Sequence, residues 1–356
     1  MTPVLILDGG LGTSLESEHG VKFNSASDPL WSSSLLLSSP STLLACQRSF
    51  TQVPVDVLLT ATYQVSARGF LTTRSAEHPQ GVSLEDIPLY LDKAVQIADE
   101  AVADAGTGTA KIALSLGPYG ACMIPSQEYS GRYDAQHNDA TQLEAWHAAR
   151  LGLFASVPDL ASRIGFVALE TVPRKDEIVA MRKALAHEPA LQGVPYWVSC
   201  LYPGGDAANP DAEENYCLPD GTSAREAVIG MLSSGHGPLP WGIGINCTKT
   251  WKLEGLLRRY EDAVREMIES GRLQQWPALV LYPDGTSGEV YNTETQVWEK
   301  PAAVPGAAQG KPWAEKLAEI VEGTVARGEW SQVLVGGCCM ASHRDIKKLR
   351  ERLLPS

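Results

Sequence analysis

Eight short apolar runs constrain the fold of this 356-residue chain more than any other feature of its sequence. Several are rich in β-branched residues, and most are followed by a loop and then by a helical pattern. Continuous apolar runs are typical of strands covered on both faces, as in parallel sheets. The runs span residues 4–7, 57–60, 111–116, 165–170, 196–200, 241–246, 278–282 and 333–337.

Amphipathic helical patterns separate these runs, most clearly at 84–105, 253–270 and 313–327. Eight strands that alternate with helices predict a (β/α)₈ TIM barrel, with an open doubly wound sheet as the alternative. Two segments rich in turn residues, 203–223 and 285–309, are predicted loops of unassigned role. The strand–helix alternation resumes after each, so we expect a single barrel domain over 1–356.

Charge and cysteine content narrow the possible partners. A net charge of -13 disfavours nucleic acid and anionic membranes as partners, because both attract basic surfaces. No apolar stretch approaches the roughly 20 residues that span a bilayer, and the first residues do not have the pattern of a signal peptide. The seven scattered cysteines do not resemble a disulfide framework. We therefore expect a soluble, cytoplasmic protein that acts on small molecules, with its oligomeric state left open.

Polar and reactive residues gather where the predicted strands end. The first strand runs into Asp8, the second into the segment that holds Thr62, and the fourth ends at Glu170. The sixth ends in Asn246 and Cys247, and the eighth in the segment GGCC at 336–339. Because the active site of a TIM barrel forms at the carboxyl ends of its strands, this asymmetry predicts a functional site there.

The cysteines indicate a metal centre. The adjacent pair Cys338 and Cys339 cannot easily form a mutual disulfide, and the two glycines before it allow both sulfurs to face one point. Cys247 comes from a nearby strand and can supply a third sulfur. Three thiolates with one open position describe a catalytic zinc site, and soft sulfur ligands favour zinc over magnesium or calcium.

Other cysteines and the histidines fit a structural interpretation. Cys46, Cys122 and Cys200 are expected to pack as small buried side chains, and Cys217 to lie in a loop. His147 is expected to be structural, and the histidines show no pattern of a metal site or a catalytic triad. No histidine is therefore assigned as a general acid or base.

Asp8 and Glu170 follow apolar strands, where an unpaired charge is costly. Three roles suit them: a general acid and base, anchors for loops, or a cradle for a ligand ammonium group. For Asp8, which precedes two glycines, the loop anchor is the default interpretation.

Eight segments together resemble the homocysteine S-methyltransferase family, zinc-dependent (β/α)₈ barrels that methylate homocysteine to methionine. They occur in family order across nearly the whole chain, and the GINC and GGCC pair is the most specific. The segments are 7–13 (LDGGLGT), 29–32 (PLWS), 60–70 (TATYQVSARGF), 117–121 (GPYGA), 129–133 (YSGRY), 170–173 (ETVP), 244–248 (GINCT) and 336–339 (GGCC).

The resemblance implies a role for each candidate residue. Cys247, Cys338 and Cys339 would be the Zn²⁺ ligands. The predicted substrate residues are Asp8 and Glu170, which would hold the amino group of homocysteine, and Thr62 and Asn246, which would line its pocket.

The resemblance also bears on the methyl donor. The PLWS and TYQ segments are similar to the branch that uses S-methylmethionine or S-adenosylmethionine rather than betaine. The sequence departs from the family after the double cysteine, where Met340-Ala341-Ser342 stands in place of the usual Arg-Thr. Betaine as donor, and a barrel without enzymatic activity whose thiols serve metal storage or redox sensing, are the alternative hypotheses. A zinc hydrolase is a weaker one, because such sites usually use His or carboxylate ligands.

Overall fold

The structure of the chain is a computed structural model, and it describes residues 2–23, 28–106, 109–286, 289–292, 297–299 and 311–355. Eight parallel strands form one sheet in the order β1-β10-β7-β6-β5-β4-β3-β2. These strands are β1 (Val4–Ile6), β2 (Val57–Leu59), β3 (Lys111–Leu116), β4 (Phe166–Val172), β5 (Tyr196–Cys200), β6 (Gly242–Asn246), β7 (Ala278–Tyr282) and β10 (Val333–Val335).

The sheet closes on itself through the first two strands. Leu7 forms a parallel bridge with Val57, and the Asp8 N–H donates to the Val57 carbonyl at 3.2 Å. Because these contacts join the two edge strands of the ordered sheet, the strands form a barrel. The predicted TIM barrel is confirmed, and the open doubly wound sheet is excluded.

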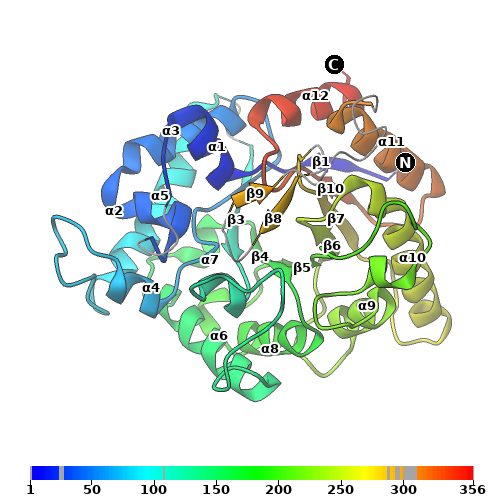
Figure 1. The fold of residues 1–356 in the computed structure, drawn as a ribbon, viewed down its shortest axis with the longest axis horizontal. Helices are drawn as coiled ribbons and strands as arrows, with labels where there is room; N and C mark the ends of the chain where they lie inside the picture. The colour runs from blue at the N-terminus through cyan, green and yellow to red at the C-terminus, as the bar shows by residue number, and fades with distance from the viewer. Residues whose placement is uncertain are drawn as a thin grey trace.

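Helices surround this barrel, as Figure 1 shows. The predicted helix at 313–327 has those bounds, the one at 253–270 ends one residue earlier, and the one at 84–105 begins later, where a proline occupies the first turn. The helices are α1 (Leu11–His19), α2 (Leu35–Ser38), α3 (Pro40–Thr51), α4 (Ala67–Thr72), α5 (Ile87–Asp104), α6 (Ala140–Phe154), α7 (Leu160–Arg163), α8 (Lys175–Ala186), α9 (Ala224–Leu232), α10 (Leu253–Glu269), α11 (Trp313–Arg327) and α12 (His343–Leu353).

Two strand ends differ from the sequence prediction. Strand β4 continues two residues past Glu170, because it pairs with β5 across a register shift and meets it again at Val172. Such an irregularity redirects side chains, and here it lies where the functional residues are expected. Strand β10 stops at Val335, and the two glycines that follow begin the turn into the cysteine pair.

Apolar side chains fill two layers. One lies inside the barrel, where Phe166, Trp197 and Leu334 pack together, and the larger one lies between the barrel and the helices. The basic C-terminal segment forms α12 and buries Ile346 and Leu349 against the larger layer. No described helix combines the length and the apolar character that a membrane crossing requires.

The two predicted loops differ in structure. Segment 203–223 contains only the short 3-10 helix η4 (Glu213–Tyr216). Segment 285–309 contains the antiparallel hairpin β8 (Val290–Asn292) and β9 (Val297–Glu299), which Figure 1 shows across the centre of the ring of helices. Residues 287–288, 293–296 and 300–309 of that segment lie outside the described residues.

Candidate active site

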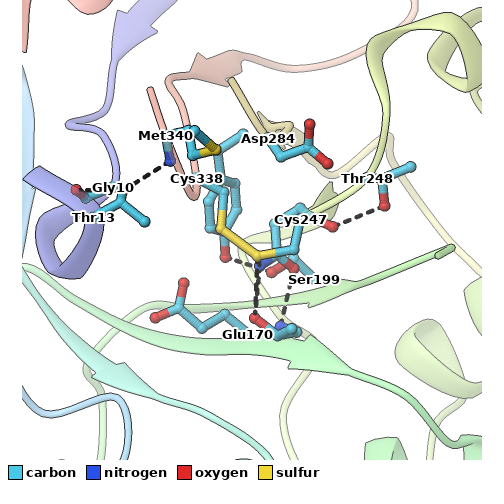
Figure 2. The surroundings of a disulfide bond; sticks show 12 residues. Gly10, Thr13, Glu170, Ser199, Cys247, Thr248, Asp284, Cys338 and Met340 are labelled. Carbon is cyan, nitrogen blue, oxygen red and sulfur yellow. Dashed lines mark hydrogen bonds between the residues drawn. A yellow bond between two sulfur atoms is a disulfide. The ribbon is translucent and has the colours of Figure 1, made fainter. Parts of the chain in front are cut away.

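The three predicted cysteine ligands converge at the carboxyl ends of the strands. Cys247 directly follows β6, Cys338 and Cys339 follow β10, and their sulfur atoms all lie within 4.8 Å of one another. Cys247 and Cys338 are joined by a disulfide with an S–S distance of 2.25 Å, which Figure 2 shows. This pairing is not apparent from the sequence, because the two cysteines are 91 residues apart and meet only where β6 and β10 lie on either side of β7.

Sulfur atoms that converge on one point can serve one metal ion or one disulfide, because both require short sulfur–sulfur separations. A tetrahedral zinc site with Zn–S bonds of about 2.3 Å places its sulfurs slightly under about 4 Å apart. The three sulfurs already lie within 4.8 Å of one another, so opening the disulfide and small side-chain shifts would bring them to that spacing. The residues therefore fit a sulfur-loving metal ion, provided that Cys247 and Cys338 are reduced to thiolates.

The Asn246 side chain supports this cluster. Its Oδ1 accepts from the Thr171 backbone N–H at 2.9 Å, and its Nδ2 donates to the Thr171 Oγ1 at 2.7 Å and to the Cys247 Sγ at 3.4 Å. Thr171 and Cys247 both have positive φ, 62° and 47°. Such a conformation is strained for a β-branched threonine and persists where surrounding contacts enforce it. Asn246 thus holds the ends of β4 and β6 together beside a sulfur atom.

The LDGGLGT segment packs against the cysteine loop. A side chain at Gly10 would place its Cβ 2.5 Å from the Cys338 carbonyl oxygen, so the close approach requires glycine. Figure 2 shows Thr13, whose Oγ1 accepts from the Met340 N–H at 2.8 Å and fixes that residue at φ 62°. The Met340 side chain is 41% exposed and does not line the cavity beside the cysteines. Ser342 begins α12 as its N-cap, so the residues that depart from the family pattern shape the loop and the helix start.

A cavity of roughly 230 Å³ adjoins the three cysteines. Its walls carry four carboxylates but no lysine, arginine or histidine among the residues that the structure describes there. A cavity with carboxylates and no basic side chain favours cationic ligands. The carboxylates are Glu16, Asp28, Glu128 and Glu170.

Glu170 lies in this cavity wall and is only 5% exposed. Ser115, at the end of β3, donates a hydroxyl hydrogen bond to its Oε1. Burial raises the pKa of Glu170 to about 7, while hydrogen bonds from Ser115 and Tyr282 and the charge of Arg150 oppose that rise. A buried carboxylate without a basic partner is costly, so a ligand cation would stabilise it.

The other predicted substrate residues lie behind the cavity wall. Asp8 accepts from the Leu59 N–H through Oδ2 at 2.9 Å, while its buried Oδ1 has no hydrogen-bond partner among the described residues. Burial raises the pKa of Asp8 well above its usual value. Thr62 donates to the Ser115 carbonyl at 2.7 Å and so acts on the residue that holds Glu170. Like Asp8 and Asn246, Thr62 does not line the cavity.

Several residues of the site were not predicted from the sequence. Tyr282 ends the apolar strand β7 and Ser115 is the second-to-last residue of β3, so the rule that singled out Glu170 could have found them. Tyr63 lines the cavity from the TATYQ segment, which was recognised only as a motif. Glu128 lines it from a long loop, where no strand end marks it.

The remaining cysteines and His147 behave as expected. Cys46 and Cys200 are almost fully buried, Cys122 is partly buried, and Cys217 lies in the loop before α9. The His147 Nε2 lies 2.9 Å from the Glu177 Oε1 inside the helix layer, away from the cavity.

The fold and the site define a TIM barrel with a sulfur-rich centre in a cavity suited to cations. The family model described as homocysteine S-methyltransferase matches residues 5–353, so the chain belongs to the homocysteine S-methyltransferase family. This membership confirms the predicted enzyme class, a methyltransferase, and the predicted acceptor, the thiol of homocysteine. It also argues against a barrel without enzymatic activity.

The relatives agree with this assignment. Homocysteine S-methyltransferase 1 of Arabidopsis thaliana is 27% identical over 98% of this chain and 93% of that protein. Selenocysteine Se-methyltransferase of Brassica oleracea var. italica is 28% identical over 98% of this chain and 88% of that protein. The crystal structure of the metallated form of the Escherichia coli homocysteine methyltransferase MmuM matches with a TM-score of 0.65 and 23% identity, covering 98% of this chain and 96% of that one. This last likeness supports the fold.

Proposed function

We propose that this methyltransferase holds zinc through Cys247, Cys338 and Cys339 and transfers a methyl group from a sulfonium donor to homocysteine, giving methionine. The observation that carries the proposal is the convergence of three sulfur atoms beside a cavity with four carboxylates. Three cysteine ligands leave one position of a tetrahedral ion for a substrate sulfur.

Zinc would supply the positive charge that keeps a thiol deprotonated at neutral pH, since a free thiol has a pKa near 8.5. The protein contributes the orientation of the ligands. Asn246 donates to the Cys247 sulfur at 3.4 Å, and Thr13 fixes the turn after Cys339 through the Met340 N–H. Hydrogen bonds of this kind tune the affinity of a metal site.

Glu170 and Asp8 would hold the ammonium group of homocysteine. Glu170 faces the cavity, and Asp8 lies behind its wall with a buried Oδ1 that has no hydrogen-bond partner among the described residues. Thr62 would act through Ser115, whose hydroxyl contacts Glu170. The carboxylates would orient homocysteine and move no proton.

Aromatic and acidic side chains favour a cationic donor. Trp31, Tyr63, Tyr129 and Trp298 line the cavity, and aromatic faces attract onium groups. Gly12 makes room for this wall, because a Cβ there would lie 2.2 Å from the Trp31 ring. S-methylmethionine and S-adenosylmethionine each carry one net positive charge, whereas betaine is neutral overall. The carboxylates therefore favour the sulfonium donors.

The transfer step balances without a general acid. The homocysteine thiol loses its proton to solvent, and a sulfur electron pair then forms the bond to the methyl carbon. The bond between that carbon and the donor sulfur breaks, and its electron pair stays on a neutral thioether. Alignment of the reacting atoms at about 3–3.5 Å is the main contribution left to the protein.

The chemistry of the three thiols also bears on the cellular compartment of the protein. Three thiols that bind a metal must stay reduced, which favours a cytoplasmic location. We further propose that residues 1–356 act as one barrel domain.

The test is methionine formation from homocysteine by the reduced, zinc-loaded chain with S-methylmethionine, S-adenosylmethionine or betaine. We expect turnover with a sulfonium donor and its loss after chelation, with recovery on adding zinc. Turnover that is unchanged after complete removal of the metal, or that occurs only with betaine, would overturn the proposal.

A further inference from the structure

Glu128 is a buried carboxylate that the roles above leave unused. It lies between the 3-10 helix η2 (Tyr119–Cys122) and α6, lines the cavity and is only 6% exposed. Its Oε2 has no hydrogen-bond partner among the described residues. Burial raises the pKa of Glu128 to about 7, although its own N–H and the Ser126 hydroxyl favour the charged form. A carboxylate placed in this way lacks the cation that would offset its burial.

Glu128 and Glu170 line the same cavity from different elements, the loop before α6 and strand β4. Tyr63 lines the cavity together with both carboxylates. The metal-binding cysteines line the same cavity as Glu128. The cavity thus offers a second buried carboxylate in addition to Glu170.

The loop that carries Glu128 is held at several points. The Gln127 N–H donates to the Gly120 carbonyl at 2.8 Å, directly beside Glu128. Farther along the loop, the Tyr133 hydroxyl donates to the fully buried Glu177 carboxylate. The backbone that carries Glu128 is therefore held before any ligand binds, which lowers the ordering cost of binding.

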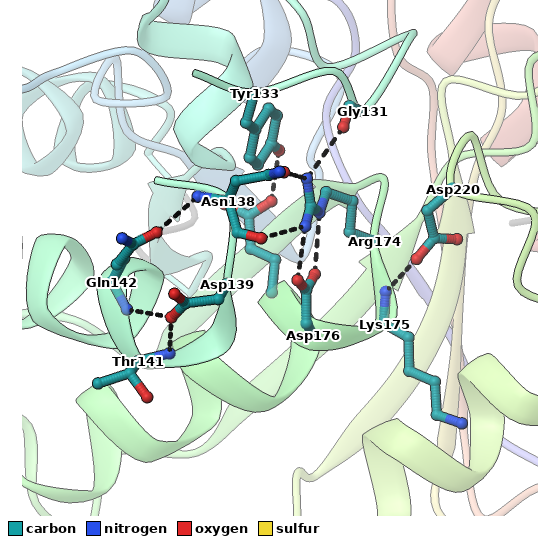
Figure 3. Close-up of polar contacts among 11 residues, drawn as sticks. Gly131, Tyr133, Asn138, Asp139, Thr141, Gln142, Arg174, Lys175, Asp176 and Asp220 are labelled. Atoms are coloured by element: carbon teal, nitrogen blue, oxygen red, sulfur yellow. Dashed lines mark hydrogen bonds and ion pairs between the residues drawn. The ribbon is translucent and has the colours of Figure 1, made fainter. Parts of the chain in front are cut away.

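Arg174 at the start of α8 is the main anchor of the same loop, as Figure 3 shows. Its guanidinium donates to the Gly131 carbonyl at 3.2 Å and to the Asn138 Oδ1 at 2.7 Å. It also pairs with Asp176 through two hydrogen bonds of 2.9 and 2.6 Å. These contacts join the loop to the barrel directly after the ETVP segment.

The chemistry of the donor supplies the missing cation. S-methylmethionine has the same amino-acid skeleton as homocysteine, and its ammonium nitrogen lies about 5 Å from its sulfonium sulfur in an extended chain of standard bonds. When the acceptor ammonium is held at Glu170, the donor ammonium needs a second carboxylate near the reacting sulfurs. We propose that Glu128 is this second ammonium site, so that the cavity selects sulfonium donors that are themselves α-amino acids.

This inference rests on the proposed function, and its test separates the two. Glu128→Gln keeps the shape of the side chain and removes its charge. The variant is compared with the parent protein on S-methylmethionine and on dimethylsulfoniopropionate, a sulfonium donor without an amino group. Glu100→Gln, which removes one exposed carboxylate from the outer helix α5, is the matched control for net charge.

We expect Glu128→Gln to raise the KM for S-methylmethionine by about 10- to 100-fold, the scale of a lost hydrogen bond to a charged group. The KM for homocysteine, the zinc content and the kinetics with dimethylsulfoniopropionate should not change. An unchanged KM for S-methylmethionine, or an equal loss with both donors, contradicts the role of Glu128.

A second comparison uses only the parent protein, so it does not depend on folding of the variant. The parent should use dimethylsulfoniopropionate with a kcat/KM at least about 10-fold below that for S-methylmethionine. Equal values would overturn the inference about Glu128. A parent protein that uses neither of these donors, and does not use S-adenosylmethionine either, would instead overturn the proposed function.

Discussion

Replacing Asn246 with aspartate should weaken metal binding while it leaves the barrel folded. The substitution keeps the Oδ1 that accepts from the Thr171 N–H, but it removes the Nδ2 that donates to the Cys247 Sγ at 3.4 Å. A hydrogen bond to a charged group contributes about 1.5–3 kcal/mol, which corresponds to roughly 10- to 150-fold in affinity. The added carboxylate also repels the thiolates, so we expect at least about a 10-fold loss.

The assay is competition for zinc between the reduced protein and a chelating dye of known affinity. Asn215→Asp is the matched control, because Asn215 is also fully buried and bridges a loop, with its Nδ2 donating to the Asn209 carbonyl at 2.8 Å. It lies in the loop before α9 and makes no hydrogen bond to a cysteine. Equal zinc affinity for Asn246→Asp and the parent protein, with both folded, would refute the role of this amide.

Two further predictions address the substrate site and the helix layer. Glu170→Gln should raise the KM for homocysteine by about 10- to 100-fold, because the variant loses the charge that would hold the substrate ammonium group. The zinc content should stay near one per chain. Loss of zinc would show that Glu170 acts on the metal site instead. Burial lowers the pKa of His147 in the folded protein below that of a free histidine. The unfolded chain therefore takes up a proton at this residue more readily than the folded protein does. As the pH falls below about 6.5, this difference lowers the free energy of unfolding. Urea unfolding between pH 7 and 5 should show the free energy of unfolding fall by up to about 1.4 kcal/mol per pH unit. The same free energy should depend less on pH in His147→Gln. An identical pH dependence in the two proteins would contradict the buried, neutral state of His147.

The sequence was sufficient to predict the barrel and the positions of its reactive strand ends. Apolar runs depend on burial, which any strand inside a barrel shares, so all eight were recognisable. Convergence of Cys247 with the cysteine pair followed from the same rule. The extension of β4 to Val172 was missed, because the register shift there depends on pairing with β5 and not on local residue preference.

Contacts between segments that are distant in the chain could not be predicted from the sequence. Thr62 and Asn246 were predicted to line the substrate pocket, yet their side chains hydrogen-bond to Ser115 and to Thr171 and Cys247. Polar residues at strand ends can face the cavity or the neighbouring strand, and the alternation of side chains within one strand does not distinguish the two at an irregular end. Glu128 was missed because tertiary contacts of its loop bring it to the cavity.

The measurement that tests the central claim most directly is the zinc content and methionine production of Cys338→Ala, purified under reducing conditions. Cys217→Ala, which removes a thiol from a loop outside the cavity, is the control. We predict about one zinc per chain and full turnover for the parent protein and the control, and neither for Cys338→Ala. A Cys338→Ala protein that makes methionine without bound metal would contradict the claim that these cysteines hold the ion that activates homocysteine.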